Sequence, residues 1–91
     1  MNKREAVYCK YFGNALKSLR QERTGKSSYM FACENDIPRS TLSRIERGEN
    51  EVGLVTLKKI AEAFGLSMSE LLQLIEQRMP ADFKIFDDEQ Y

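Results

Sequence analysis

Residues 27–48 constrain the fold of this chain most, because they predict two short helices joined by a tight turn. Leu42 and Ile45 are spaced for one face of the second helix, whereas Arg39 and Arg44 fall on another face. A helix that is apolar behind and carries arginines and small hydroxyls in front suits the major groove of DNA, where arginine can donate two hydrogen bonds to guanine O6 and N7. The stretch therefore predicts a helix pair whose second member fits a DNA groove.

Several positions in this stretch resemble the phage-repressor-like helix-turn-helix family, also called the Xre or lambda-repressor-like type. Ala32 stands where the family has a small residue between the two helices, and Asp36 stands where it usually has the turn glycine. Leu42 and Ile45 match two apolar positions of the recognition helix, and the letters IERG at 45–48 match the family's Ile-Glu-x-Gly ending. The resemblance implies an all-α, five-helix, lambda-repressor-like DNA-binding domain.

The resemblance covers about residues 12–72, and hydrophobic periodicity predicts the helices individually. We expect five helices, at about 4–23, 28–35, 38–47, 54–64 and 68–78. The helix-turn-helix DNA-binding domain then spans 1–78, and a short C-terminal tail spans 79–91. In the fourth helix, one apolar face should comprise Leu54, Leu57, Ile60, Ala61 and Phe64.

Local signals predict where these helices begin and end. Gly25 is a natural stop for the first helix, and Ser27 can cap the second. Asp36 is expected in the turn with positive φ, which aspartate and asparagine tolerate better than most residues. Pro38 is expected at the first position of the recognition helix, where its fixed φ is favourable. The fifth helix should start with a capping box formed by Ser67 and Glu70.

Composition argues against several classes of protein. The 91 residues include no histidine, and the two cysteines, Cys9 and Cys33, do not form a CxxC pair. The usual general base, the common nucleophile pairs and most zinc sites are therefore missing, so we expect no enzyme, metal, cofactor or small-molecule ligand. No stretch has the roughly 20 apolar residues of a membrane span, and the first residues contain no long apolar run. We expect a cytoplasmic protein.

The net charge is zero, but its distribution is uneven. Residues 1–48 hold ten Lys/Arg and five Asp/Glu, or +5; residues 49–78 hold three and five, or −2; residues 79–91 hold one and four, or −3. The positive charge accompanies the predicted recognition elements, as a DNA-binding face requires.

The resemblance and the residue chemistry together predict which side chains meet DNA. Base contacts are expected from the exposed face of the recognition helix, at Arg39, Ser40, Thr41, Ser43 and Arg44. Phosphate contacts are expected from the ends of the second and third helices and the loops beside them, at Lys26, Ser28, Tyr29, Arg47 and Asn50. The alternative for the recognition helix is an ordinary solvated face.

Two further predictions concern structure and assembly. The family pairs an arginine of the first helix with the glutamate of the recognition helix, which implies an ion pair of Glu46 with Arg20, or alternatively with Arg23. The apolar residues of the tail could fold back over the fifth helix or contact a second subunit. The predicted dimer contacts are Leu72, Ile75, Phe83, Ile85 and Phe86.

The sequence thus predicts sequence-specific binding to a double-stranded DNA operator by a transcriptional regulator that acts as a homodimer. Antitoxins and controllers of restriction systems are variants of this function. The alternative from another class is a protein-interaction adaptor or antagonist that keeps the fold and binds a partner through the fifth helix and the tail. Salt-dependent binding to duplex DNA distinguishes the two.

Overall fold

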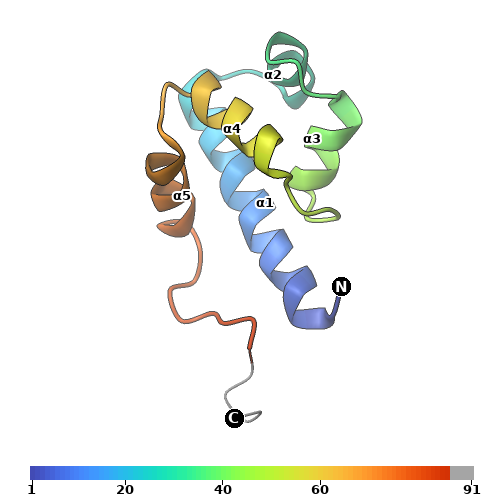
Figure 1. The fold of residues 1–91 in the computed structure, drawn as a ribbon, viewed down its shortest axis with the longest axis vertical. Coiled ribbons are helices and arrows are strands. Elements are labelled where there is room, and N and C mark those ends of the chain that lie inside the picture. Colours follow the sequence, from blue (N-terminus) through green and yellow to red (C-terminus); the bar gives the residue numbers. More distant parts are fainter. Residues whose placement is uncertain (87–91) are drawn as a thin grey trace.

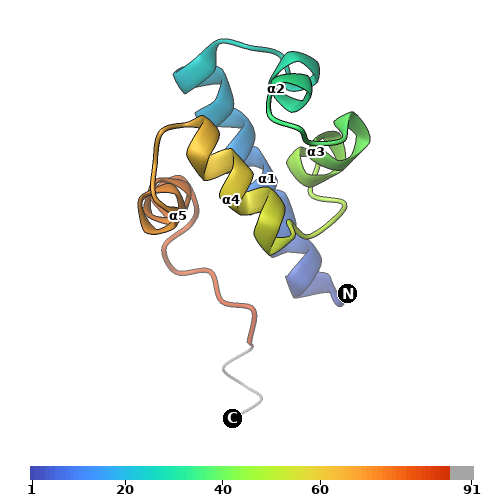
Figure 2. The same cartoon turned by 45° about the horizontal axis from the view of Figure 1, so that its top comes forward.

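The computed structural model describes residues 1–86, and this part of the chain folds into five α-helices without a β-strand. The helices are α1 (Lys3–Thr24), α2 (Ser28–Glu34), α3 (Arg39–Glu46), α4 (Leu54–Ala63) and α5 (Met68–Glu76). Figure 1 shows α1 as the long central helix, with α2 and α3 on one side and α5 on the other. The turned view in Figure 2 shows the same arrangement, with the C-terminal segment running toward the start of α1. The predicted fold class is confirmed.

The core is built from one apolar stripe on each helix. α1 contacts both α3 and α5, α2 contacts α3, and α4 contacts α5. The largest fully buried side chains, each at most 2% exposed, are Leu16, Leu19, Phe31, Leu42, Ile60, Leu71 and Ile75. Each such side chain contributes on the order of 1.5–3 kcal/mol through burial, so a small bundle can be stable without a metal or a disulfide. Both cysteines are free thiols.

Most predicted helix ends are confirmed. Gly25 has φ 65° and closes α1, the Ser27 hydroxyl accepts a hydrogen bond from the backbone N–H of Met30, and Ser67 and Glu70 form the expected capping box. α1 also begins with a capping box that was not predicted, formed by Asn2 and Glu5. The predicted bounds differ from the observed ones by at most two residues.

Three predictions about individual positions are wrong. Pro38 is the N-cap of α3 (φ −58°, ψ 133°) rather than its first helical residue, so α3 starts one residue later than expected. Leu54 is 75% exposed, since it lies in the first turn of α4 before the helix reaches the core. Ile75 is only 1% exposed in the core of the single chain, so its side chain is not available as a dimer contact.

The C-terminal segment packs against α1. The Phe83 ring lies 5.3 Å from the ring of Tyr11 and 6.3 Å from that of Tyr8, measured between centroids. The Arg4 guanidinium lies 5.2 Å from the Phe83 centroid and donates hydrogen bonds to the backbone carbonyls of Lys84 and Ile85. Of the two alternatives for the tail, folding back is observed for Phe83, but onto α1 rather than onto the fifth helix, and contact with a second subunit stays a prediction. Residues 87–91 of the predicted tail lie outside the described residues.

Candidate nucleic-acid interface

The recognition helix α3 has a buried back and an exposed front. Leu42, Ile45 and Glu46 are buried, whereas Arg39, Ser40 and Arg44 are exposed and Thr41 and Ser43 are half-buried. A helix held from behind in this way presents its front to a ligand in a fixed orientation. The predicted base-contacting residues therefore lie on the exposed side of α3, with Thr41 at the edge of that side.

The turn between α2 and α3 is fixed by several contacts. Asp36 has φ 55°, as predicted, and the backbone N–H of Ile37 donates to the carbonyl of Ala32 at 3.0 Å. Ala32 is 0% exposed, so only a small side chain fits there. Lys59 of α4 donates a 2.7 Å hydrogen bond from Nζ to the Asp36 carbonyl, and its Nζ lies 3.6 Å from the Asp36 carboxylate. The turn is thus attached to α4 as well as to α2.

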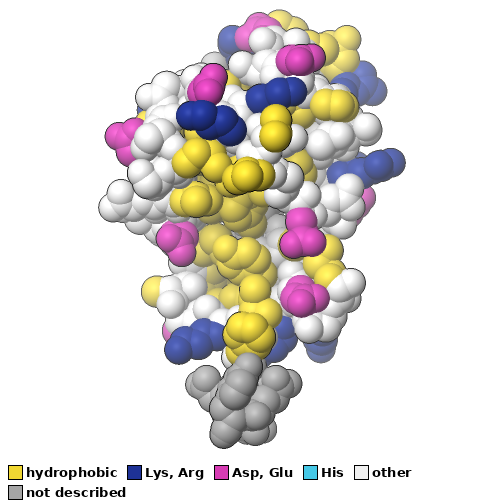
Figure 3. All heavy atoms as spheres, viewed as in Figure 1, with side chains coloured by type: hydrophobic (Ala, Val, Ile, Leu, Met, Phe, Trp, Pro, Cys, Tyr) yellow, Lys and Arg dark blue, Asp and Glu magenta, His cyan; other side chains and the backbone are white. Residues whose placement is uncertain are grey.

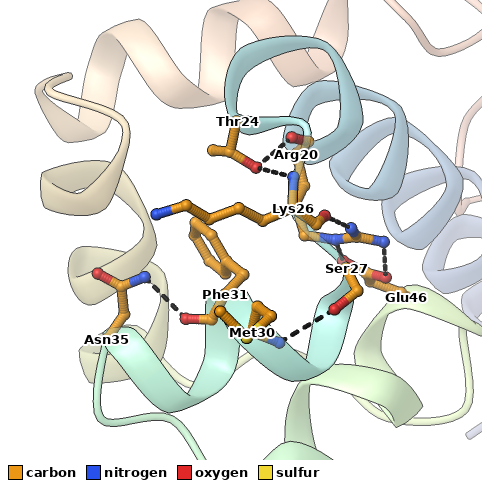
Figure 4. Close-up of polar contacts among 8 residues, drawn as sticks. All are labelled: Arg20, Thr24, Lys26, Ser27, Met30, Phe31, Asn35 and Glu46. Carbon is orange, nitrogen blue, oxygen red and sulfur yellow. Dashed lines mark hydrogen bonds and ion pairs between the residues drawn. The ribbon is translucent and has the colours of Figure 1, made fainter.

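An ion pair of Arg20 and Glu46 joins α1 to the end of α3. Arg20 Nε lies 2.7 Å from Glu46 Oε2, and Arg20 Nη2 lies 3.0 Å from Oε1, which is a bidentate geometry. Arg20 Nη1 also donates to the carbonyl of Lys26, just before α2 (Figure 4). Both side chains are buried, at 4% and 7% exposure. Of the two predicted partners, Glu46 therefore pairs with Arg20, while Arg23 donates to the Phe64 carbonyl at 3.4 Å.

The exposed front of α3 and the start of α2 form one surface depression of about 300 Å³. Its lining consists of predicted contact residues, namely Ser28, Tyr29, Arg39, Ser40, Ser43, Arg44 and Arg47. Arg47 pairs with Glu49 at 2.9 Å, whereas Arg39 and Arg44 form no ion pair within residues 1–86. Two arginines of this surface therefore keep their charge and their hydrogen-bond donors for a ligand.

Two predicted phosphate contacts lie apart from this depression. Lys26 pairs with Glu34 of α2, so its charge is partly compensated. Asn50 lines a separate cavity of about 210 Å³ with residues of α1, among them Tyr8 and Phe12. Neither residue lines the depression at the front of α3.

Sequence reasoning missed two polar residues of α1 at the edge of the site. Asn14 and Lys17 line a neighbouring depression of about 370 Å³ together with Ser28, Ser43 and Arg47. Lys17 forms no ion pair among the described residues. The available signal was spacing, because Lys17 lies three residues before Arg20 on the same side of a helix.

Three ionisable groups outside this surface have shifted pKa values. A hydrogen bond from Ser18 and the contact with Arg78 lower the pKa of Glu22. Hydrogen bonds from the backbone and side chain of Ser67 lower the pKa of Glu70, while burial raises the pKa of the Cys9 thiol. Within residues 1–86 there is no group of three or more His, Cys, Asp or Glu side chains arranged to hold a metal ion. None of the helices described here is both long and apolar enough for a membrane crossing.

Comparison with known proteins gives a consistent result. A family model described as helix-turn-helix matches residues 16–71, which is more than half of the chain. The control protein C.MunI of Mycoplasma sp is 46% identical over 66 residues, covering 72% of this chain and 89% of that protein. The control protein C.BamHI of Bacillus amyloliquefaciens is 34% identical over 61 residues, covering 67% of this chain and 75% of that protein. The matched region contains the whole surface formed by α2 and α3.

Proposed function

Since this chain belongs to the repressor-like helix-turn-helix family of DNA-binding transcriptional regulators, we propose that it reads an operator by inserting α3 into the major groove. The observation that carries this proposal is the front of α3, where Arg39 and Arg44 are exposed and form no ion pair within the described chain. Each can donate two hydrogen bonds to a guanine. Ser40 and Ser43 supply hydroxyls in the same depression, whereas Thr41 does not line it.

The phosphate backbone is held by groups around this front. Ser28, Tyr29 and Arg47 line the same depression as the two arginines, and Lys17 lies at its edge. Such contacts set the register of the helix on the duplex without reading sequence. The contacts from the charged residues Arg47 and Lys17 also make binding fall with salt, because each phosphate that they neutralise releases counterions.

The protein acts as a homodimer, since one α3 reads only a few base pairs and half-sites about one turn apart give typical specific affinity. Figure 3 shows hydrophobic side chains in a band that runs from α4 down to the C-terminal segment. Leu54 and Val55 of α4 are 75% and 69% exposed, and Phe86 is 67% exposed. Large exposed apolar groups of this kind favour a subunit contact. With Ile75 in the core, we place the dimer contact on α4 and the tail.

A controller of restriction genes is the favoured biological role, because two similar proteins are named control proteins. The role requires a cytoplasmic protein that binds DNA and performs no chemistry. The absence of histidine from the sequence supports a non-enzymatic function.

The test is selection of bound duplexes from a random pool, followed by titrations with the selected and with random DNA. Arg44→Ala should weaken binding to the selected site by about 1–3 kcal/mol and to random DNA much less. Lys58→Ala is the control, because it removes an exposed positive charge on α4 that already pairs with Glu62. Absence of salt-dependent duplex binding by the unaltered protein would support the adaptor alternative instead.

Dimer formation is tested separately by sedimentation. Leu54→Ser combined with Val55→Ser should lower the dimer fraction at matched concentration while the helical circular dichroism signal stays unchanged. Leu72→Ser tests the half-buried position predicted on α5. A double variant that remains fully dimeric would place the interface elsewhere.

A further inference from the structure

The start of α3 carries an arginine that lies on an aromatic ring of α2. The Arg39 Cζ atom is 4.9 Å from the centroid of the Tyr29 ring, within the distance at which a guanidinium is attracted to a ring face. Arg39 is the first residue of α3 and Tyr29 the second residue of α2. The contact therefore spans the helix-turn-helix from one helix start to the other.

The part of α2 that carries Tyr29 is held in place by buried neighbours and by the N-cap of the helix. Its neighbours Phe31 and Ala32 are 2% and 0% exposed, and the Ser27 cap fixes the first turn of α2. Tyr29 as a whole is 49% exposed, so part of the residue contacts the protein and part faces solvent. A tyrosine side chain has few rotatable bonds, whereas an arginine has many, so the ring restricts the arginine more than the reverse.

Arg44 provides a comparison on the same helix. It lines the same depression as Arg39, but no aromatic ring or acidic group pairs with it in the part of the chain that is described. The two arginines thus differ in how they are held before any ligand binds. Of these two arginines, Arg39 alone has its guanidinium against another side chain among the described residues.

We propose that Tyr29 is a specificity-determining positioning residue, whose ring face directs the Arg39 guanidinium toward one base pair of the operator. This inference rests on the proposed function. It gives the ring a role separate from the phosphate contact predicted for Tyr29, which would use the hydroxyl. Restricting Arg39 before binding lowers the ordering cost of its contact with the correct base.

The two roles predict different behaviour for three substitutions. Tyr29→Phe keeps the ring face and removes the hydroxyl. Tyr29→Leu keeps apolar volume and removes the ring face, and Tyr29→Ala removes both. The experiment selects duplexes with each full-length protein and measures affinities for the selected site and for every single-base variant of it. Arg39→Ala and Arg44→Ala identify the base pairs that these two arginines read.

We expect Tyr29→Phe to discriminate between bases like the unaltered protein. Tyr29→Leu and Tyr29→Ala should lose about two- to fivefold of the discrimination at the base pair read by Arg39, as an exposed cation–π contact implies. Discrimination at the base pair read by Arg44 should not change, and neither should the dependence of binding on salt. Circular dichroism melts establish that each variant is folded, and Tyr29→Leu supplies the result if Tyr29→Ala is not.

Two results would overturn the inference while leaving the proposed function intact. One is full discrimination by Tyr29→Leu, which would mean that the ring does not direct Arg39. The other is a uniform loss on all sequences by Tyr29→Phe and Tyr29→Leu alike, with the discrimination between bases unchanged, which would leave Tyr29 as a phosphate contact only. If the unaltered protein selects no sequence, the proposed function itself fails, and the inference with it.

Discussion

Gly13 of α1 lies directly against the backbone carbonyl of Ile45, at the end of the recognition helix. A Cβ atom on Gly13 would lie 2.4 Å from the Ile45 oxygen and 2.6 Å from that of Glu46. Both neighbours are backbone atoms, so neither can move aside alone. Glycine is therefore required here for close approach of two helices, although it disfavours the helix that contains it.

Gly13→Ala should destabilise the protein by about 1–3 kcal/mol through overpacking, despite the better helix propensity of alanine. Asn14→Ala is the matched control, since residue 14 is exposed on the same helix and should be neutral or slightly stabilising. Urea denaturation of the three proteins measures the difference. Equal stability of both variants would show that α1 and α3 can separate without cost.

Removal of one partner of the buried Arg20–Glu46 pair should be more damaging. Glu46→Leu leaves the Arg20 guanidinium buried at 4% exposure without its carboxylate, at a cost of about 3–5 kcal/mol. The double variant Arg20→Met with Glu46→Leu should recover much of that loss, because it leaves no unpaired charge. Urea denaturation midpoints of the unaltered protein, the single variant and the double variant measure these losses. A double variant as unstable as the single one would mean that the hydrogen bond from Arg20 to the Lys26 carbonyl is the dominant interaction.

The turn residue Asp36 gives a prediction about backbone conformation. Asp36→Gly should be neutral to mildly stabilising, because glycine accepts φ 55° freely and the Lys59 hydrogen bond goes to the backbone carbonyl. Asp36→Val should be clearly destabilising, because a β-branched residue is strained at positive φ. Thermal melts decide between these expectations, and tolerance of valine would mean that the turn relaxes to another conformation.

Glu70 predicts a pH dependence of stability. Hydrogen bonds from Ser67 lower its pKa in the folded protein below the ordinary value of 4.5. Its stabilising contribution is therefore complete above the ordinary pKa and is lost as the pH falls through the lowered one. The difference in thermal midpoint between the unaltered protein and Glu70→Gln should be largest near neutral pH and should shrink below pH 4.5. A constant difference would show that the carboxylate charge does not contribute.

The features that the sequence predicted correctly are the helix caps and the turn, which depend on residues only a few positions apart in the chain. Gly25, Ser27, Asp36 and the Ser67 capping box act within a few residues, and each has the predicted conformation or contact. Helical periodicity likewise located all five helices among residues 1–86. The base- and phosphate-contact assignments are still predictions, since they concern a ligand.

What the sequence did not predict depends on packing between distant segments. The role of Gly13 arises from the carbonyls of α3, and the position of Phe83 arises from Tyr8 and Tyr11 of α1. Leu54 has the right spacing for the core face, yet the bundle does not extend over the first turn of α4. Hydrophobic periodicity predicts which side of a helix is apolar. It does not predict how much of the helix length is covered by the neighbouring helices.

The hydrogen bond from Lys59 to the Asp36 carbonyl connects α4 to the turn just before α3, the helix proposed to enter the major groove. The same α4 begins with Leu54 and Val55, the two residues proposed for subunit contact. Because one helix carries both the proposed subunit contact and this link to the turn, we expect the dimer to hold its two α3 helices at one separation, so that half-sites moved off that separation weaken binding even when every base is correct.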